Sequence, residues 1–126
     1  MQKQYVILSG LFVMISIVLG AMGAHALKKV LDPDLFSSFD VAVRYQGFFS
    51  MGMLILALNS DRFAFSMNRI LGGMMVGMLF FCFSIYLLIL MNVMQWPKGI
   101  LVAFTPIGGS ITIISWLVFL YRLIKN

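Results

Sequence analysis

The side chains that could do chemistry in this sequence are few, and most of them stand between residues 25 and 46. His25 is the only histidine, and it would either hydrogen-bond carbonyls at a helix end or transfer protons. Asp40 and Arg44 are four residues apart with the acid first, which suits an ion pair along a helix. Arg44 would either pair with Asp40 and orient its helix or bind a phosphate or other anionic group. Gln46 follows two residues later.

A second group of candidate residues surrounds a proline near the C-terminus, in the segment Thr105-Pro106-Ile107-Gly108-Gly109. Proline removes a backbone donor and clashes with the carbonyl four residues before it, so it kinks a helix. Glycines allow the distorted backbone to approach another helix. We expect a structural kink at Pro106 that Thr105 and neighbouring helices relieve. The alternative is an interrupted helix whose backbone groups bind an ion or a substrate.

Catalytic and metal-binding patterns are missing from the sequence. No serine stands in a glycine-framed motif, and no spacing links a nucleophile to His25 and an acid. Cys82 is flanked by phenylalanines, and one histidine with one cysteine is too few donors for a metal site. The eleven methionines are scattered and are expected to fill gaps between helices. We therefore expect no catalytic site, no metal site and no cofactor, and a protein that is not an enzyme.

The composition shows which solvent surrounds these residues. Of 126 residues, 62% are hydrophobic and 10% are charged, whereas soluble domains have about 45–50% apolar and about 25% charged residues. A chain of this length cannot hide so much apolar surface from water. This excludes a soluble enzyme, a disordered tail and a disulfide scaffold, and it predicts that lipid surrounds most of the chain. The net charge of +5 comes from single basic residues beside apolar stretches, which excludes nucleic-acid binding.

Four continuous apolar stretches are long enough to cross a membrane as helices, which takes about 20 residues. They predict an all-α, single-domain integral membrane protein over residues 1–126, with the first stretch retained rather than cleaved as a signal peptide. The predicted spans are residues 5–27, 41–58, 70–91 and 99–121.

The connections between these spans predict their arrangement. Residues 60–69 and 92–98 are short links, so neighbouring helices should be antiparallel and form an up-down-up-down four-helix bundle. Asp32 followed by Pro33 suits the start of a helix. Leu35, Phe36 and Phe39 then recur at helical spacing among polar residues. This pattern predicts a short interfacial helix between spans one and two.

The distribution of basic residues indicates the orientation. Cytoplasmic segments of membrane proteins carry an excess of Lys and Arg. The side with both termini would carry five basic residues and the other side four. We therefore expect both termini in the cytoplasm. The two sets are Lys3, Arg62, Arg69, Arg122 and Lys125 on the first side, and Lys28, Lys29, Arg44 and Lys98 on the second.

Small residues at helical spacing predict where the helices touch. Lipid is as apolar as leucine, so helices associate in it through close packing of small residues. Such residues occur in spans one, three and four, and the GxxxG pair of span three could pack within the bundle or between copies. The predicted packing residues are Ser16, Gly20, Ala24, Gly73, Gly77 and Thr112.

Four segments match, in order along the chain, the motifs of a known family. They are GAMGAHALK at 20–28, AVRYQ at 42–46, FCFSIY at 81–86 and TPIGG at 105–109. By these motifs the chain resembles the YgdD-like family of small bacterial inner-membrane proteins (domain of unknown function 423). The resemblance implies four spans in the bacterial inner membrane and no established activity. It also implies that any binding site lies at the end of the bundle where these motifs gather, which the orientation above places outside the cytoplasm.

The chain departs from the family pattern at three positions. A histidine usual in the family three residues after the motif glutamine is replaced by Phe49, and Phe83 and Ser115 replace two glycines. If the family histidine served proton or metal chemistry, this chain would lack that chemistry.

Three functions follow from these features. The one we favour is a non-enzymatic membrane protein or accessory subunit that packs against lipid, its own copies or a larger membrane complex. The second is a small transporter, channel or lipid-binding protein with a site near Arg44 and the fourth span; proton-coupled cation export is not expected, because every acidic residue lies in a loop or at a span boundary. The third is an enzyme acting on lipid-linked substrates, which would need His25, Asp40 and Arg44 to meet.

Overall fold

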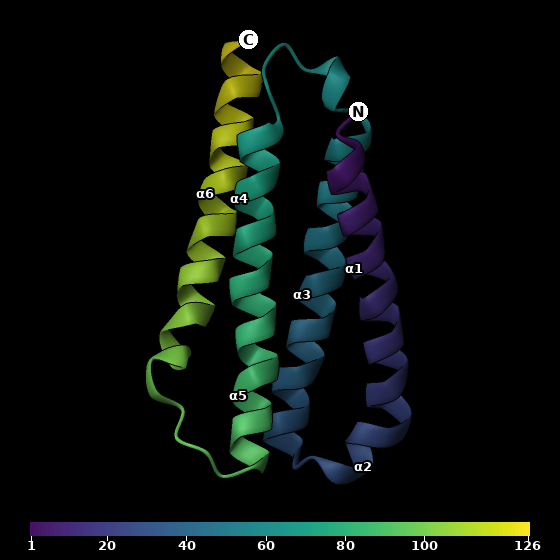
Figure 1. Ribbon diagram of the computed structural model, residues 1–126, viewed down its shortest axis with the longest axis vertical. Coiled ribbons are helices and arrows are strands. Elements are labelled where there is room, and N and C mark those ends of the chain that lie inside the picture. Colours follow the sequence, from purple (N-terminus) through teal and green to yellow (C-terminus); the bar gives the residue numbers. More distant parts are fainter.

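The computed structural model describes residues 1–126 and contains helices joined by short connections, without strands. Four helical segments are long and apolar enough to cross a membrane, which confirms the predicted all-α four-span fold. They lie side by side and alternate in direction, with both termini at the same end (Figure 1). The segments are Lys3–Val30, Pro33–Leu58, Asn68–Val93 and Gly99–Lys125.

Three of the four segments are not uniform α-helices, because a π-helical or 3-10 turn interrupts or precedes the α-helix. The first segment consists of α1 (Lys3–Met22), a π-helical turn η1 (Gly23–Leu27) and α2 (Lys28–Val30). The second is α3 (Pro33–Leu58). The third consists of α4 (Asn68–Met78), a π-helical turn η3 (Leu79–Phe83) and α5 (Ser84–Val93). The fourth consists of a 3-10 turn η4 (Gly99–Ala103) and α6 (Phe104–Lys125), and a further 3-10 turn, η2, spans Ser60–Arg62.

The start of α3 follows the local chemistry of Asp32 and Pro33. The Asp32 side chain accepts a hydrogen bond from the Asp34 amide at 3.0 Å, and Pro33 occupies the first helical position, as predicted. The helix then continues without a break to Leu58. The short interfacial helix is therefore not a separate element: its residues form the first turns of α3, because no residue between 34 and 58 interrupts the backbone hydrogen bonds.

The fourth span changes its helical form ahead of its proline rather than at it. Residues 99–103 form a 3-10 turn, and Pro106 is the third residue of the α-helix that follows. An N–H at this position would donate to a carbonyl of the 3-10 turn, four residues earlier. Its absence in proline therefore removes no hydrogen bond from within the α-helix. The predicted kink inside the helix is thus a junction between two helical forms.

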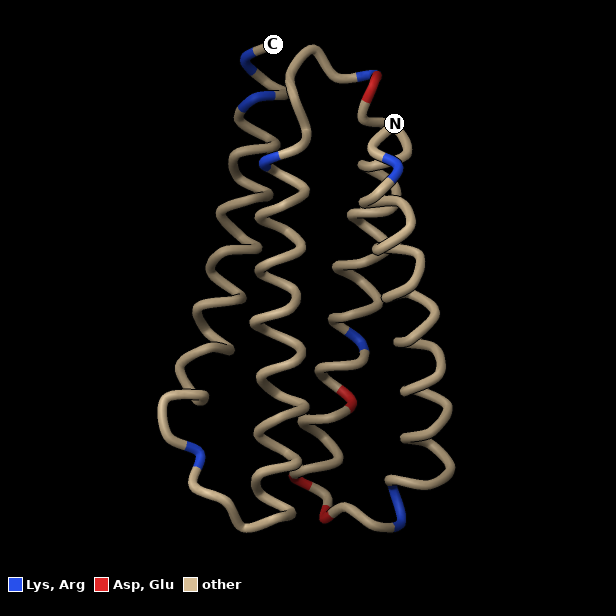
Figure 2. The backbone as a smooth tube through the Cα atoms, in the orientation of Figure 1, with Lys and Arg blue, Asp and Glu red and all other residues tan.

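Charged residues gather at the two ends of the bundle (Figure 2). We call the end with both termini and the 59–67 connection the terminal end, and the end with the 31–32 and 94–98 connections the opposite end. At the terminal end the Met1 amine pairs with Asp61. Only α3 carries acidic and basic residues well inside its length, away from both ends (Figure 2).

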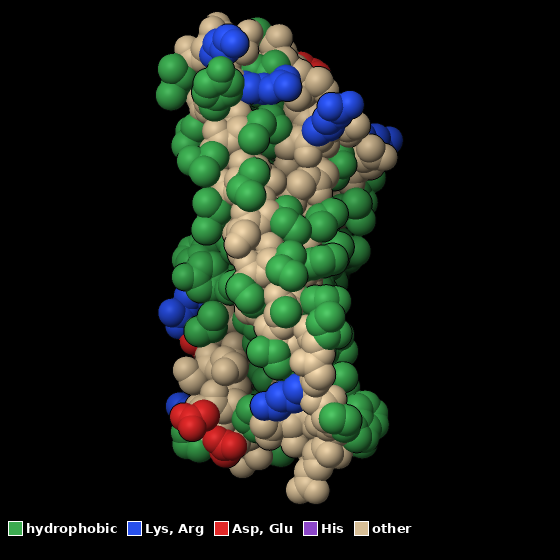
Figure 3. Space-filling view, turned by 90° about the vertical axis from the view of Figure 1, so that its left-hand side faces the viewer, with side chains coloured by type: hydrophobic (Ala, Val, Ile, Leu, Met, Phe, Trp, Pro, Cys, Tyr) green, Lys and Arg blue, Asp and Glu red, His purple; other side chains and the backbone are tan.

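The surface between the two ends is apolar, as lipid requires. Large hydrophobic side chains face outward on all four segments, among them Ile17, Phe48, Leu87 and Ile113. One face of the bundle accordingly shows hydrophobic groups along its middle and most of its basic groups towards the two ends (Figure 3). A protein that exposes this much apolar surface is stable in a bilayer rather than in water.

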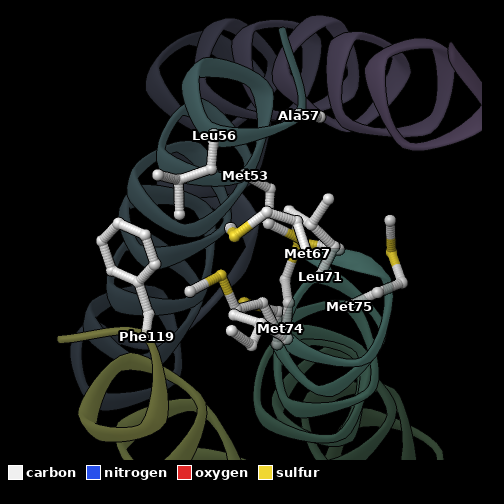
Figure 4. Close-up of a cluster of buried hydrophobic side chains, with 11 residues drawn as sticks. Met53, Leu56, Ala57, Met67, Leu71, Met74, Met75 and Phe119 are labelled. Carbon is white, nitrogen blue, oxygen red and sulfur yellow. The ribbon is translucent and has the colours of Figure 1, made fainter. Parts of the chain in front are cut away.

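The largest buried cluster lies toward the terminal end and is rich in methionine (Figure 4). Met53 of α3 meets Met74 and Leu71 of α4, and Phe119 of α6 closes the cluster. Methionine is flexible and fills irregular spaces between helices. The members are Met53, Leu56, Ala57, Met67, Ile70, Leu71, Met74, Met75, Met78, Cys82 and Phe119.

Helices α4 and α6 approach through the small residues of spans three and four. A Cβ added at Gly77 would lie 2.8 Å from the Thr112 nitrogen and 2.9 Å from the Gly108 carbonyl oxygen. A Cβ at Gly108 would meet the backbone of Phe81, and one at Gly73 would meet the Ser115 hydroxyl. The GxxxG pair therefore packs inside the bundle, where the two backbones nearly touch.

Helices α1 and α3 form the second close pair, with a register that the sequence pattern missed. Ser16 and Gly20 face α3, where Gly47 and Val43 lie opposite them. Ala24, the third residue of the predicted stripe, is exposed, and Gly23 is buried against the ring of Phe39 instead. Helical spacing is the reason, because Gly23, seven residues after Ser16, lies only about 20° from it around the helix axis, whereas Ala24 lies about 80° away.

Candidate functional site

A fully buried glutamine links three helices. The Gln46 side chain has no exposed surface. Its Nε2 donates to the Phe12 carbonyl of α1 at 2.9 Å, and its Oε1 accepts a hydrogen bond from the Tyr86 hydroxyl of α5 at 2.7 Å. A buried amide is costly unless it is hydrogen bonded. Gln46 therefore joins α1, α3 and α5 in one orientation, which is a structural task.

A second polar contact joins the third and fourth spans. The hydroxyls of Ser84 and Thr105 are 2.6 Å apart, and the Ser84 hydroxyl lies 2.9 Å from the Phe81 carbonyl, to which it donates. Phe81 belongs to the π-helical turn η3, where the ordinary helical hydrogen-bond pattern is interrupted. Thr105 thus contacts the irregular turn of the neighbouring span, one residue before Pro106.

Asp40 and Arg44 form an ion pair on the outside of the bundle. The Arg44 Nη2 and Asp40 Oδ2 atoms are 2.5 Å apart, and 61% of the Arg44 side chain and 49% of the Asp40 side chain are exposed. The pair lies on α3, the segment that carries charges well inside its length (Figure 2). Because both side chains are exposed, the ion pair must contact water, lipid headgroups or another protein.

His25 does not join that pair. It lies exposed in the π-helical turn η1, and its side chain forms neither a hydrogen bond nor an ion pair with Asp40 or with any other residue. Of the three residues that a membrane enzyme would have to bring together, only Asp40 and Arg44 are therefore joined.

A groove lies at the opposite end between α3, α5 and the start of the fourth span. It has a volume of about 460 Å³ and is both polar and apolar. We call it the α3–α6 groove. Its lining residues are Leu35, Ser37, Ser38 and Val41 of α3, Ile85, Leu88 and Ile89 of α5, and Lys98, Val102 and Thr105.

A second groove at the same end, of about 550 Å³, runs between α1 and α5 and is lined only by hydrophobic side chains. Ile15 and Leu19 form one wall, and Phe83 and Leu90 form the other. Ile89 lines this groove as well as the α3–α6 groove. The opposite end therefore has two surface hollows that apolar chains could fill.

The structure distributes the predicted site residues instead of gathering them. Gln46 is inside the bundle, Asp40 and Arg44 lie on the outer side of α3, and His25 lies on the first span. Of the fourth-span residues, Thr105 lines the α3–α6 groove and Pro106 is exposed. Gly108 and Gly109 pack against Phe81 of the third span.

Several residues of these sites were not singled out from the sequence. Tyr86, the partner of Gln46, appeared only as the end of the FCFSIY motif. Lys98 was counted for orientation, and Ser37 and Ser38 only as the polar side of a short helix, although all three line the α3–α6 groove. The tyrosine at the end of that motif was the one available signal, because it is polar within an apolar stretch.

Phe49, which replaces the usual histidine of the family pattern, is part of an aromatic cluster. Its ring centroid lies 5.6 Å from that of Tyr45 and 5.7 Å from that of Phe81. Aromatic pairs at such distances stabilise packing. No three His, Cys or Asp side chains stand close enough together to hold a metal ion.

The fold and these sites define a small multi-pass membrane protein with short connections and charges gathered mainly at its ends. Residues 19–109 match the model of a family described as "Protein of unknown function (DUF423)". The chain belongs to this family.

Related membrane proteins occur in several bacteria. The chain is 35% identical to a UPF0382 membrane protein of Staphylococcus epidermidis over 98% of this chain and 97% of the relative. It is 30% identical to a UPF0382 membrane protein of Haemophilus influenzae over 100% and 98%, and 27% identical to YwdK of Bacillus subtilis over 98% of both. No solved structure matches the chain. None of these names states an activity.

Proposed function

We propose that this chain is a non-enzymatic protein of the bacterial inner membrane that binds another membrane protein, or a second copy of itself, through one side of α3. We call this side the outer face of α3. It consists of the Asp40–Arg44 ion pair and the exposed side chains that continue along the same stripe of the helix: Phe48, Met51 and Ile55.

The main support for this proposal is the depth in the membrane at which Asp40 and Arg44 lie. Asp40 and Arg44 lie about 10 Å and about 16 Å along the axis from Pro33, at 1.5 Å per residue. The headgroup region is only about 5–7 Å thick on each side of the hydrocarbon core. With Pro33 at the outer edge of the headgroup region, Asp40 lies at the boundary of the hydrocarbon core and Arg44 lies deeper, while both stay exposed on the surface of the chain. Charged groups facing lipid at this depth are costly, and a protein partner removes that cost.

The rest of the outer face suits such a partner. Phe48, Met51 and Ile55 are 65%, 45% and 54% exposed and follow the ion pair toward the terminal end. A helix of the partner can cover this apolar stripe while a polar group of the partner meets Asp40 or Arg44. Interhelical contacts of this mixed kind hold membrane complexes together.

The non-enzymatic part of the proposal is supported by how the polar residues are used. Gln46 and Tyr86 hydrogen-bond each other, Ser84 bonds Thr105, and His25 stands apart from Asp40. No pair of groups is arranged as nucleophile and base. The helical form of the chain supports the inner membrane as its location, since proteins of the outer membrane are β-barrels.

Purification of the tagged chain from native membranes in a mild detergent tests the proposal. A companion protein, or a second copy with a different tag, is expected to co-purify with the wild type and to be lost with Arg44→Ala. Arg62→Ala is the matched control, because Arg62 lies in the 3-10 turn η2 at the terminal end. A strictly monomeric chain without any companion would contradict the proposal, as would equal recovery with both variants.

The α3–α6 groove favours a second candidate function, the binding or passage of an anionic amphiphile. Lys98, Ser37 and Ser38 lie at the membrane boundary, while Val41 and Ile85 line the groove more deeply. Liposome flux of such an amphiphile, compared between the wild type, Lys98→Ala and Arg44→Ala, tests passage. Absence of flux in the wild type would exclude a transport function.

A further inference from the structure

A separate polar pocket lies at the terminal end, between the start of α4 and the last turns of α6. Its volume is about 340 Å³, and its lining brings two arginines together with two neutral polar residues and two apolar ones. We call it the terminal pocket. It is lined by Ser66, Asn68, Arg69, Ile70, Val118 and Arg122.

The two arginines of the terminal pocket have no acidic partner. The chain contains two ion pairs, Arg44 with Asp40 and the Met1 amine with Asp61. Asp61 is the only acidic residue at the terminal end, and it already forms an ion pair with the Met1 amine. Arg69 and Arg122 therefore place two uncompensated positive charges beside the same cavity.

One of these arginines is held by an aromatic ring. The guanidinium carbon of Arg122 lies 6.0 Å from the centroid of the Phe65 ring, a distance at which a cation is attracted to the ring face. Phe65 immediately precedes Ser66 in the connection that leads to α4. This contact links α6 to that connection and limits the positions that Arg122 can take beside the pocket.

From these contacts we propose that the terminal pocket binds the phosphate group of an anionic phospholipid. The planar guanidinium group presents paired N–H donors that match phosphate oxygens, and two such groups share the charge of one headgroup. The Ser66 hydroxyl and the Asn68 amide supply further donors at the same cavity. Basic pockets between membrane helices bind anionic headgroups in this way.

The position of the pocket favours a lipid over a dissolved phosphate ion. Arg69 is the second residue of α4, and Arg122 lies in the last turn of α6, so both stand at headgroup depth. Ile70 and Val118 continue the lining with apolar surface, and Val118 is exposed toward the surroundings of the bundle. A phospholipid can place its phosphate at the arginines and its chains along this apolar side.

Lipid binding to the purified chain tests the proposal. The detergent-solubilised protein is titrated with phosphatidylglycerol, with phosphatidylcholine and with inorganic phosphate, and bound lipid is counted by native mass spectrometry while the melting temperature is followed. We expect phosphatidylglycerol to bind and to raise the melting temperature. Phosphatidylcholine has the same phosphate but adds a choline cation that the two arginines repel, and inorganic phosphate lacks acyl chains for the apolar side of the pocket, so each should bind at least about tenfold more weakly. Equal effects of phosphatidylcholine or of inorganic phosphate would overturn the assignment to an anionic lipid.

Single substitutions place the binding in the pocket. Arg69→Gln and Arg122→Gln should each weaken phosphatidylglycerol binding by about tenfold. Arg62→Gln is the matched control, because it removes an arginine from the same end but not from the pocket lining, and it should leave binding unchanged. An equal decrease in all three variants would overturn the proposal, since it would mean attraction by net charge alone. Helical content of each variant without lipid shows that it has folded.

This inference is independent of the proposed partner at the outer face of α3. The terminal pocket uses α4 and α6, and neither contributes a residue to that face. Loss of lipid binding would leave co-purification of a partner unaffected, and the reverse also holds.

Discussion

Gln46 shows how a single polar residue can organise a helix bundle in lipid. Hydrophobic side chains gain little free energy by contacting a neighbouring helix instead of lipid, because the two are equally apolar. The Gln46 amide favours helix contact, since it hydrogen-bonds the Phe12 carbonyl on one side and the Tyr86 hydroxyl on the other. Its burial therefore specifies which sides of α1, α3 and α5 face each other.

The hydrogen bond between Gln46 and Tyr86 should make the effects of substituting these two residues non-additive. In a double-mutant cycle with Gln46→Leu and Tyr86→Phe, the two should be coupled by about 0.6 kcal/mol, the average for interhelical hydrogen bonds in membrane proteins. The free energy of unfolding in mixed micelles of each variant and of the double variant is the measurement. Strictly additive losses would mean that this hydrogen bond does not stabilise the fold.

The sequence could identify Gln46 as a candidate but not its partner. A lone amide in an apolar stretch can be recognised in the sequence. Its hydrogen-bond partner, however, depends on how each helix is rotated about its axis. Spans three and four are apolar on nearly every side, so no polar face reveals that rotation. The separation of His25 from Arg44 could not be predicted for the same reason.

At the scale of elements, span length was predictable because it follows from the thickness of the bilayer. Each predicted span lies within one observed helical segment, and the observed segments are longer by a few residues at most ends. The π-helical turns were not predictable, because they change the backbone hydrogen bonds without changing which residues are apolar. The stripe from Ser16 through Gly20 continues at Gly23 rather than at Ala24 for a different reason, because residue i+7 lies nearer to the same side of a helix than residue i+8.

The packing of Gly23 against Phe39 and the exposure of Ala24 predict opposite outcomes for these two adjacent residues. A side chain at Gly23 would enter the space of the Phe39 ring, whose Cε1 atom lies 2.7 Å from the added Cβ. Gly23→Leu should lower the free energy of unfolding by about 1–3 kcal/mol. Ala24→Leu places the same side chain on the exposed side and should change it by less than about 0.5 kcal/mol. Equal losses at both positions would argue against the packing of Gly23 on Phe39.

The close approach of α4 and α6 gives a similar comparison between two glycines. Gly77→Ala places a methyl group against the backbone of Thr112 and Gly108, so it should lower the free energy of unfolding by about 1–3 kcal/mol. Gly10→Ala is the matched control, because nothing lies within 4 Å of an added Cβ there. Thermal unfolding in detergent would show the difference. If Gly77→Ala were as stable as Gly10→Ala, the two helices would not be packed as described.

At the scale of the whole molecule, the orientation depends on a small difference in charge. We predict that both termini are cytoplasmic, so a fluorescent reporter that matures only in the cytoplasm should fluoresce when fused after Asn126. Removing Lys3 and Arg62 by substitution with Gln leaves three basic residues on the terminal side against four on the other, and should produce mixed or reversed orientation. Activity of a periplasmic phosphatase at the same fusion point in the wild type would contradict this prediction.

The whole molecule also explains why function is harder to predict than fold. Hydrophobic length determines how often the chain crosses the bilayer, but the partner of a membrane protein depends on a few exposed side chains. Here the spacing of Asp40 and Arg44 already suggested an ion pair, whereas only the structure shows that the pair is exposed on the outside of one continuous helix.

The most direct test of a partner at the outer face of α3 is photo-crosslinking in intact membranes. A benzophenone amino acid is introduced at Phe48, beside the ion pair, and separately at Ile17 on α1, which has nearly the same exposure, 67% against 65%. We expect a discrete protein adduct from position 48 that Arg44→Ala abolishes, and only lipid adducts from position 17. Lipid adducts alone at both positions would contradict this expectation.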